Sequence, residues 1–161
     1  MKTLFSSLFL TLFLVVFTGQ KLAAQDSGIG VGIIVGEPTG LSFKYWLGGG
    51  SAIDAALAWS LEGRNSFSIH GDYLRHFELI EVESGHLPFY AGLGVRMRFL
   101  EDRPGNDDND NFRLGVRIPL GIAYLFEDIP LELFLEVVPT LDLITSTEFD
   151  MNFGVSGRWY F

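Results

Sequence analysis

The sequence predicts an all-β protein in which eight antiparallel strands close into an up-and-down transmembrane β-barrel. Apolar and polar side chains alternate along eight separate segments of about 9–15 residues, and aromatic residues gather near the segment ends. A tilted strand needs about 9–11 residues to cross the hydrocarbon layer of a bilayer, which fits these lengths. The expected strands are residues 28–36, 40–48, 52–61, 66–77, 88–100, 112–126, 131–143 and 149–161.

The first four segments each place apolar side chains at every second position. The first alternates isoleucine and valine with glycine, and the second opposes leucine, phenylalanine and tyrosine to a set that includes Lys44. The third has Asp54 on its polar face, and the fourth has His70 and Asp72. Because successive side chains of a strand point to opposite faces, each segment has one apolar and one polar face.

The last four segments follow the same rule and carry more charge. Arginines gather on the polar faces of the fifth and sixth segments, and acidic residues gather on those of the seventh and eighth. Pro119 and Pro139 interrupt the sixth and seventh segments. Proline has no N–H to donate to a neighbouring strand, so we expect a β-bulge near each of them.

The polar faces together predict a charged barrel interior. Eight strands enclose space for side chains but not for a wide channel, and an unpaired buried charge is costly. We therefore expect the inward charges to pair across the lumen as a structural network, with Gly92, Gly94, Gly115 and Gly121 leaving room for them. The expected network consists of Lys44, Asp54, Asp72, Arg96, Arg98, Arg113, Arg117, Glu132, Glu136, Asp142, Asp150 and Arg158.

Residues 1–24 have the pattern of a secretory signal peptide. Lys2 precedes an apolar run from Leu4 to Phe17, and a cleavage zone with small residues runs from Gly19 to Ala24. The run is shorter than the roughly 20 residues that a helix needs to span a bilayer. We expect cleavage after Ala24, which leaves residues 25–161 as one barrel domain.

The composition excludes several classes of function. The 161 residues include no cysteine, so disulfides and thiolate chemistry are excluded. The formal charge is −9, and loss of Lys2 and Lys21 with a signal peptide would make it −11. A protein with this negative charge is a poor binder of nucleic acid, and we expect no nucleic-acid partner. We also expect no cofactor.

Three neighbouring polar residues have the types needed for nucleophilic catalysis. Ser68, His70 and Asp72 share the inward face of one expected strand. Residues two apart on a strand lie about 6.6 Å apart with nearly parallel side chains, which is too far for a nucleophile and its base. A hydrogen-bonded interior histidine is the simpler interpretation, and we assign no catalytic residue.

Residues 101–111 are dense in carboxylate and amide oxygens. Asp107, Asp108 and Asp110 are candidate ligands for a divalent cation, alongside the phosphates of lipopolysaccharide. Their spacing is not that of an EF-hand, and a solvated surface loop is the alternative interpretation. We assign no metal centre.

The signal peptide, the eight alternating segments and the terminal Trp159-Tyr160-Phe161 resemble the small OmpA/OmpX-type outer-membrane barrels. Residues 36–46, 52–59 and 124–128 are also similar to an uncharacterised family of such barrels, which has no established activity. The resemblance implies the outer membrane of a Gram-negative bacterium, contact with its lipid and lipopolysaccharide, and recognition of Phe161 by the barrel-assembly machinery. The chain departs from OmpA in having no peptidoglycan-binding domain after its last expected strand.

We therefore expect a monomeric, non-enzymatic protein of the bacterial outer membrane. Its role would be structural, or an interaction at the cell surface through extracellular loops whose partner the sequence does not name. One alternative is a narrow ion-conducting pore, and another is a lipid-modifying outer-membrane enzyme. A third is a soluble lipocalin-like barrel with a ligand in an apolar interior, because alternation alone does not say which face is inside.

Overall fold

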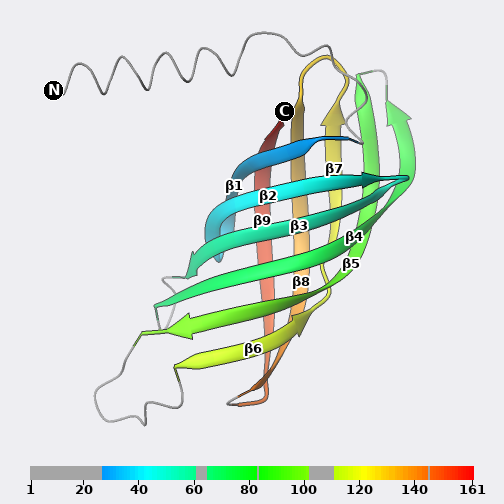
Figure 1. Cartoon of the computed structure of the whole chain (residues 1–161). Coiled ribbons are helices and arrows are strands. Elements are labelled where there is room, and N and C mark those ends of the chain that lie inside the picture. Colours follow the sequence, from blue (N-terminus) through cyan, green and yellow to red (C-terminus); the bar gives the residue numbers. More distant parts are fainter. Residues whose placement is uncertain (1–26, 61–64, 83, 102–110, 145) are drawn as a thin grey trace, which may run out of the picture.

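The computed structural model describes residues 27–60, 65–82, 84–101, 111–144 and 146–161. The expected signal peptide and the candidate cation ligands Asp107, Asp108 and Asp110 lie outside these residues. The strands are β1 (Ile29–Glu37), β2 (Thr39–Gly48), β3 (Ser51–Ser60), β4 (Ser66–Val82), β5 (Gly85–Leu100), β6 (Phe112–Arg117), β7 (Leu120–Phe126), β8 (Leu131–Ile144) and β9 (Glu148–Tyr160) (Figure 1).

These strands form one closed antiparallel ring. Apart from β6 and β7, which do not pair with each other, successive strands pair along the chain, and β1 pairs with β9 to close the sheet. The short strands β6 and β7 share one place in the ring, because both pair with β5 on one side and with β8 on the other. The ring therefore has eight positions, which confirms the predicted eight-stranded antiparallel barrel.

The predicted bulges at Pro119 and Pro139 are wrong. The register between neighbouring strands is the same on both sides of each proline, and the register shifts lie instead at Trp46/Gly48, Glu78/Ile80 and Leu114/Gly115. Pro119 O accepts a hydrogen bond from Gly92 N at 2.9 Å, and Pro139 O accepts one from Ile118 N at 3.0 Å. Each proline thus loses only the bond that its own nitrogen cannot donate, so the strands need not slip.

The barrel has two ends, which we name by residues at each. The Phe161 end holds the C-terminal residue, the Gly48–Ser51 turn and the connection from β7 to β8. The Glu148 end holds the connection from β8 to β9 and the last residue of β5, Leu100. In Figure 1 the Phe161 end lies uppermost and the β8–β9 connection lies at the bottom.

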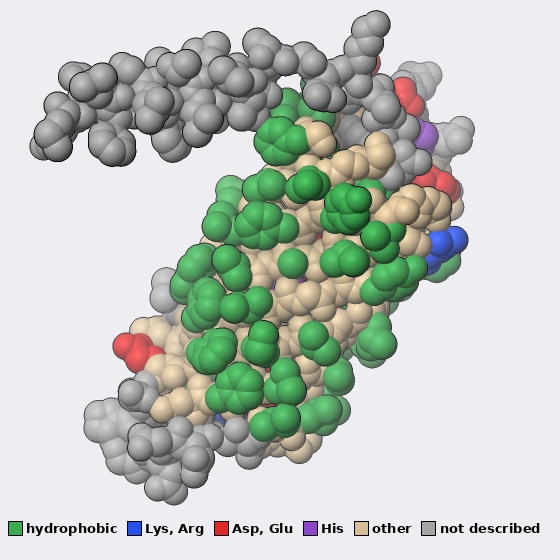
Figure 2. Space-filling view, in the orientation of Figure 1, with side chains coloured by type: hydrophobic (Ala, Val, Ile, Leu, Met, Phe, Trp, Pro, Cys, Tyr) green, Lys and Arg blue, Asp and Glu red, His purple; other side chains and the backbone are tan. Residues whose placement is uncertain are grey.

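The outward face of the wall is apolar and the inward face is polar. Large apolar side chains such as Val35, Leu93 and Phe149 are 61%, 64% and 64% exposed, whereas Lys44 and Arg158 are each 1% exposed. Figure 2 shows apolar side chains spread over the barrel wall. A lipocalin-like barrel requires the opposite arrangement, so that alternative is wrong. Within the described residues, no helix is long and apolar enough to span a membrane.

Two apolar clusters also lie inside the barrel, between layers of charge. One consists of Ile34, Ala56, Leu74, Tyr90, Ala123 and Phe134. The other, close to the Phe161 end, consists of Trp46, Ala52, Leu125 and Tyr160. The lumen is therefore filled by alternating polar and apolar groups.

Candidate functional site: the charged interior

The most deeply buried charges gather around Glu132 near the Phe161 end. Lys44 Nζ lies 2.9 Å from Glu132 Oε1, and Arg158 Nη1 lies 3.4 Å from the same oxygen. Arg158 forms a second ion pair with Asp54, and the Tyr160 hydroxyl donates a hydrogen bond to Glu132 Oε2. These five residues, the Glu132 cluster, come from β2, β3, β8 and β9 and tie those strands together across the lumen.

Neutral groups complete the surroundings of the two cations. Lys44 Nζ lies 2.9 Å from His76 Nε2 and 4.2 Å from the centre of the Trp46 ring. Because an ammonium group can only donate, His76 Nε2 accepts, and Nδ1 carries the proton that faces Gly50 O at 3.2 Å. The Lys44 ammonium group thus has two hydrogen-bond partners and an aromatic ring around it, and such partners are what a wholly buried charge requires.

Arg158 is enclosed in the same way. Its Nε donates to Ser42 Oγ at 2.7 Å, and its guanidinium carbon lies 4.0 Å from the centre of the Phe134 ring. Phe134 belongs to the first apolar cluster and packs edge-on against Tyr90, with ring centres 6.3 Å apart. The apolar cluster thus forms one wall of the Glu132 cluster.

A second set of charges lies midway along the barrel. Arg117 Nε lies 3.0 Å from Asp72 Oδ1, and its Nη2 lies 4.0 Å from Glu136 Oε1. Tyr90 donates a hydrogen bond of 3.0 Å to Glu136 Oε2. His70 lies beside Asp72, with Nε2 4.0 Å from Oδ2. This set links β4, β5, β6 and β8.

The third set of charges gathers around Arg96 near the Glu148 end. Arg96 Nη2 lies 3.0 Å from Asp142 Oδ2, and Nη1 lies 3.0 Å from Asp150 Oδ2 and donates to Asn152 Oδ1 at 2.8 Å. Arg98 Nη1 lies 3.3 Å from the same Asp150 oxygen. The side chains of Arg98 and Asp150 are 19% and 30% exposed, so these five residues, the Arg96 cluster, reach the mouth of the barrel.

The twelve residues that the sequence predicts as a lumen network lie on the inward face. Nine of them are buried, and Arg98, Arg113 and Asp150 are partly exposed. Arg113 pairs with Glu148 at the rim. The expectation omitted the neutral partners Ser42, His76, Tyr90, Asn152 and Tyr160, although the same alternation places them inward. Each of these five side chains carries a polar group on the inward face, so the sequence already indicated that they could join the network.

Inward glycines make space for the long charged side chains. A Cβ added at Gly94 would overlap the Asp72 carboxylate, and one added at Gly115 would overlap that of Asp142. A Cβ at Gly121 would overlap the Tyr90 ring. Each of these glycines therefore faces a member of the network on a neighbouring strand.

Little free space remains between the described side chains at one level of the lumen. A cavity lined by residues that include His70, Arg117, Glu136 and Asn152 has a volume of about 10 Å³. This is at most enough for a single water molecule. At this level of the barrel the described side chains therefore fill most of the lumen.

The geometry gives no support to a nucleophilic site. Ser68 donates a 3.5 Å hydrogen bond to Ala58 O, and the hydrogen bonds of the described residues include none between Ser68 and His70. All three of Ser68, His70 and Asp72 are buried within the barrel. No group of three or more His, Cys, Asp or Glu side chains among the described residues is arranged to hold a metal ion.

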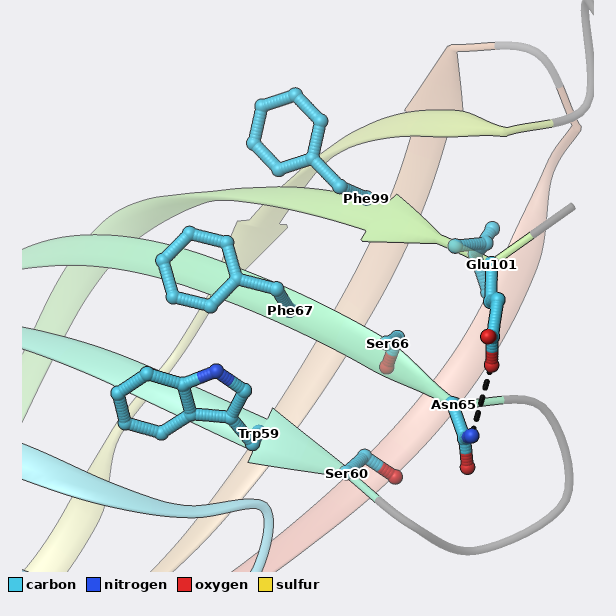
Figure 3. A pocket seen from close by; sticks show the side chains of 8 residues that line it. Trp59, Ser60, Asn65, Ser66, Phe67, Phe99 and Glu101 are labelled. Carbon is cyan, nitrogen blue, oxygen red and sulfur yellow. Dashed lines mark hydrogen bonds between the residues drawn. The ribbon is translucent and has the colours of Figure 1, made fainter.

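A groove of about 320 Å³ lies on the surface near the Glu148 end (Figure 3). Trp59, Phe67 and Phe99 line it in a row, with ring centres 5.4 Å and 6.3 Å apart. At its edge Asn65 Nδ2 donates a 2.7 Å hydrogen bond to Glu101 Oε2. The groove therefore joins an apolar wall to a polar rim.

Two solved structures are similar to this barrel. The N-terminal β-barrel domain of Pseudomonas aeruginosa OprF has a TM-score of 0.63 and 14% sequence identity, and the match covers 83% of this chain and 95% of that domain. Neisserial surface protein A (NspA) has a TM-score of 0.53 and 12% identity, over 83% of this chain and 93% of that one. No protein-family model matches the sequence, and no curated protein is similar to it. The similarity to an uncharacterised family therefore stays a prediction, whereas the fold is that of the small OmpA/OmpX-type outer-membrane barrels.

Proposed function

We propose that this chain is an integral protein of the bacterial outer membrane with a closed lumen and a non-enzymatic role. That role is structural, or an interaction at the cell surface through the loops of the Glu148 end. The observation that carries the proposal is the combination of an apolar outer wall with paired charges inside a closed ring.

The apolar wall supports insertion into a bilayer. Soluble monomers rarely expose a continuous apolar patch larger than a few hundred Å², because such a surface is unfavourable in water. Here the exposed apolar side chains extend around the ring, from Ile33 on β1 to Leu93 on β5 and Leu135 on β8. The described strands form a closed ring without an open sheet edge. A bilayer requires this closure, because lipid cannot satisfy unpaired backbone groups.

The route to the membrane follows from the sequence pattern and remains part of the proposal. Residues 1–24 would direct export and be removed, and the barrel-assembly machinery would recognise the terminal Phe161. Phe161 is 55% exposed, and its backbone N–H and C=O pair with Ile29 at the seam between β1 and β9. It is therefore accessible directly after β9, the strand that pairs with β1 to close the ring.

The filled lumen supports a barrel that does not conduct hydrated ions. An ion crossing it would have to displace the Arg96 cluster, the apolar cluster around Phe134 and the Glu132 cluster in turn. Planar-bilayer recordings test this, since a closed lumen gives no discrete channel events. Regular single-channel steps from the purified protein would support the narrow-pore alternative instead.

The first experiment is cell fractionation combined with gels of unboiled and boiled samples. After expression of the full chain, we expect the protein in the outer-membrane fraction, with a faster band in the unboiled sample than in the boiled one. Recovery in the soluble periplasmic fraction would contradict the proposal. Mass spectrometry of lipid A from the same cells addresses the enzymatic alternative, because an active lipid-modifying enzyme would change its mass.

A further inference from the structure

Arg75 is an exposed cation on β4, in the part from Ser66 to Phe77 whose other outward residues are uncharged. The other outward side chains between Ser66 and Phe77 are Phe67, Ile69, Gly71, Tyr73 and Phe77. The outward side chains of the neighbouring strands are also uncharged, from Ile53 to Trp59 on β3 and from Phe89 to Phe99 on β5. None of the ion pairs formed by the described residues includes Arg75. Its charge therefore needs a partner from outside the chain or from solvent.

Two hydroxyl groups converge with this guanidinium. Arg75 Nη1 donates to Ser51 Oγ at 2.9 Å, and the Tyr73 hydroxyl donates to the same oxygen at 2.9 Å. Ser51 is 8% exposed and lies opposite Arg75 in the β3–β4 ladder. A guanidinium has five N–H donors, so holding one of them fixes the group and leaves others to bind a ligand.

Arg75 lies near the Phe161 end of the barrel wall and not at its centre. Ser51 is the first residue of β3, directly after the Gly48–Gly50 turn at the Phe161 end. Tyr73 and Phe77 flank Arg75 on the outward face and are 51% and 50% exposed. Tyrosine and cationic side chains at this depth are typical of the level of lipid headgroups.

The outward surface of β5 beside Arg75 is apolar. The residue opposite Arg75 on β5 is Ala91, whose side chain is small. Beyond it, Leu93 is 64% exposed and continues the apolar wall toward the middle of the barrel. A ligand with a phosphate at Arg75 would therefore lay an acyl chain along an exposed apolar surface.

We infer that Arg75, Tyr73 and Ser51 form a binding site for the phosphate diester of a glycerophospholipid headgroup. Charge complementarity selects the phosphate, because a guanidinium matches two phosphate oxygens with parallel N–H donors. The Tyr73 hydroxyl uses its one proton on Ser51 Oγ, which also accepts from Arg75. Ser51 Oγ therefore keeps its own proton to donate to a phosphate oxygen at the same place. The inference rests on the proposed membrane insertion, and it names the lipid class bound at the Phe161 end.

Native mass spectrometry of the refolded full chain in dodecylmaltoside tests the site. The probe is dioleoyl phosphatidylethanolamine, and dioleoylglycerol has the same chains without the phosphate. We expect retention of one phosphatidylethanolamine and little dioleoylglycerol, with roughly tenfold weaker retention in Arg75→Gln and a smaller loss in Tyr73→Phe. Tyr45→Phe is the matched control, because Tyr45 is also 51% exposed near this end, and it should not change retention.

The outcomes separate the site from the proposed function. Equal retention by wild type and both Arg75→Gln and Tyr73→Phe would overturn the site, as would equal binding of dioleoylglycerol. Displacement of the lipid by millimolar inorganic phosphate would overturn it in favour of a site for free phosphate. The unboiled gel shift of the same samples monitors the barrel. A wild-type protein that shows the shift but retains no phospholipid contradicts the site alone, and one that stays soluble without detergent contradicts both.

Discussion

The Glu132 cluster and the Arg96 cluster use the same chemistry at opposite ends of one lumen, but they differ in burial. In the first, the Lys44 and Glu132 side chains are both 0% exposed, and an apolar layer lies on one side. In the second, Arg98 and Asp150 are partly exposed at the mouth. Burial makes removal of one partner costly, whereas solvent can replace a partner at the mouth. The Phe161 end should therefore contribute more to stability than the Glu148 end.

Glu132→Gln should have the largest effect. It removes the carboxylate shared by Lys44 and Arg158, and it leaves Lys44 buried without an opposite charge in contact. We expect a loss of about 3–5 kcal/mol in the free energy of unfolding, measured by urea titration in detergent with the gel shift as readout. The double variant Lys44→Met/Glu132→Gln should recover part of this loss. An unchanged urea midpoint for Glu132→Gln would contradict the comparison.

Phe134→Ala should come next. It removes the ring against Arg158 and opens a cavity in the apolar cluster, at a cost of about 3 kcal/mol in the same titration. Phe153→Ala is the control, because Phe153 is 57% exposed on the outward face and leaves no interior cavity. If both variants lose the same stability, the apolar cluster is not a distinct part of the lumen.

Asp142→Asn should have an intermediate effect. Arg96 would lose one carboxylate but would keep Asp150 and Asn152, so no cation is left without a partner. We expect a loss of about 1–2 kcal/mol, close to that of one hydrogen bond to a charged group. A loss as large as that of Glu132→Gln would show that the two clusters are equivalent and would remove the distinction between the ends.

Arg98→Gln should have the smallest effect. Its pair with Asp150 is partly exposed, and such pairs contribute less than about 1 kcal/mol. High salt distinguishes the exposed pair from the buried ones, because roughly 1 M salt screens exposed charges and leaves buried pairs nearly unchanged. The difference between wild type and Arg98→Gln should therefore vanish in high salt, and that between wild type and Glu132→Gln should persist. Loss of both differences would contradict the assigned burial.

Alternation in the sequence was enough to predict which side chains share a face. The twelve charged residues assigned to one face lie on one face of the barrel, because a strand turns successive side chains by half a turn regardless of its neighbours. The strand count followed in the same way. The sequence predicted one strand where the structure has β6 and β7. The two occupy one place in the ring, because their register with β5 is continuous across Pro119.

The sequence by itself thus determined the strands, their two faces and the balance of charge on the inward one. Only the tertiary structure decided which face is inside, since alternation is symmetric and closure of β1 on β9 is what makes one face concave. The tertiary structure also decided which charged residues pair with one another. Glu132 meets Lys44 and Arg158, which are 88 and 26 residues away in the chain, because the stagger of strands around the ring brings them to one level. Contacts between strands also explain why the register is unchanged at Pro119 and Pro139. At each proline the carbonyl oxygen still accepts a backbone hydrogen bond from a residue elsewhere in the chain.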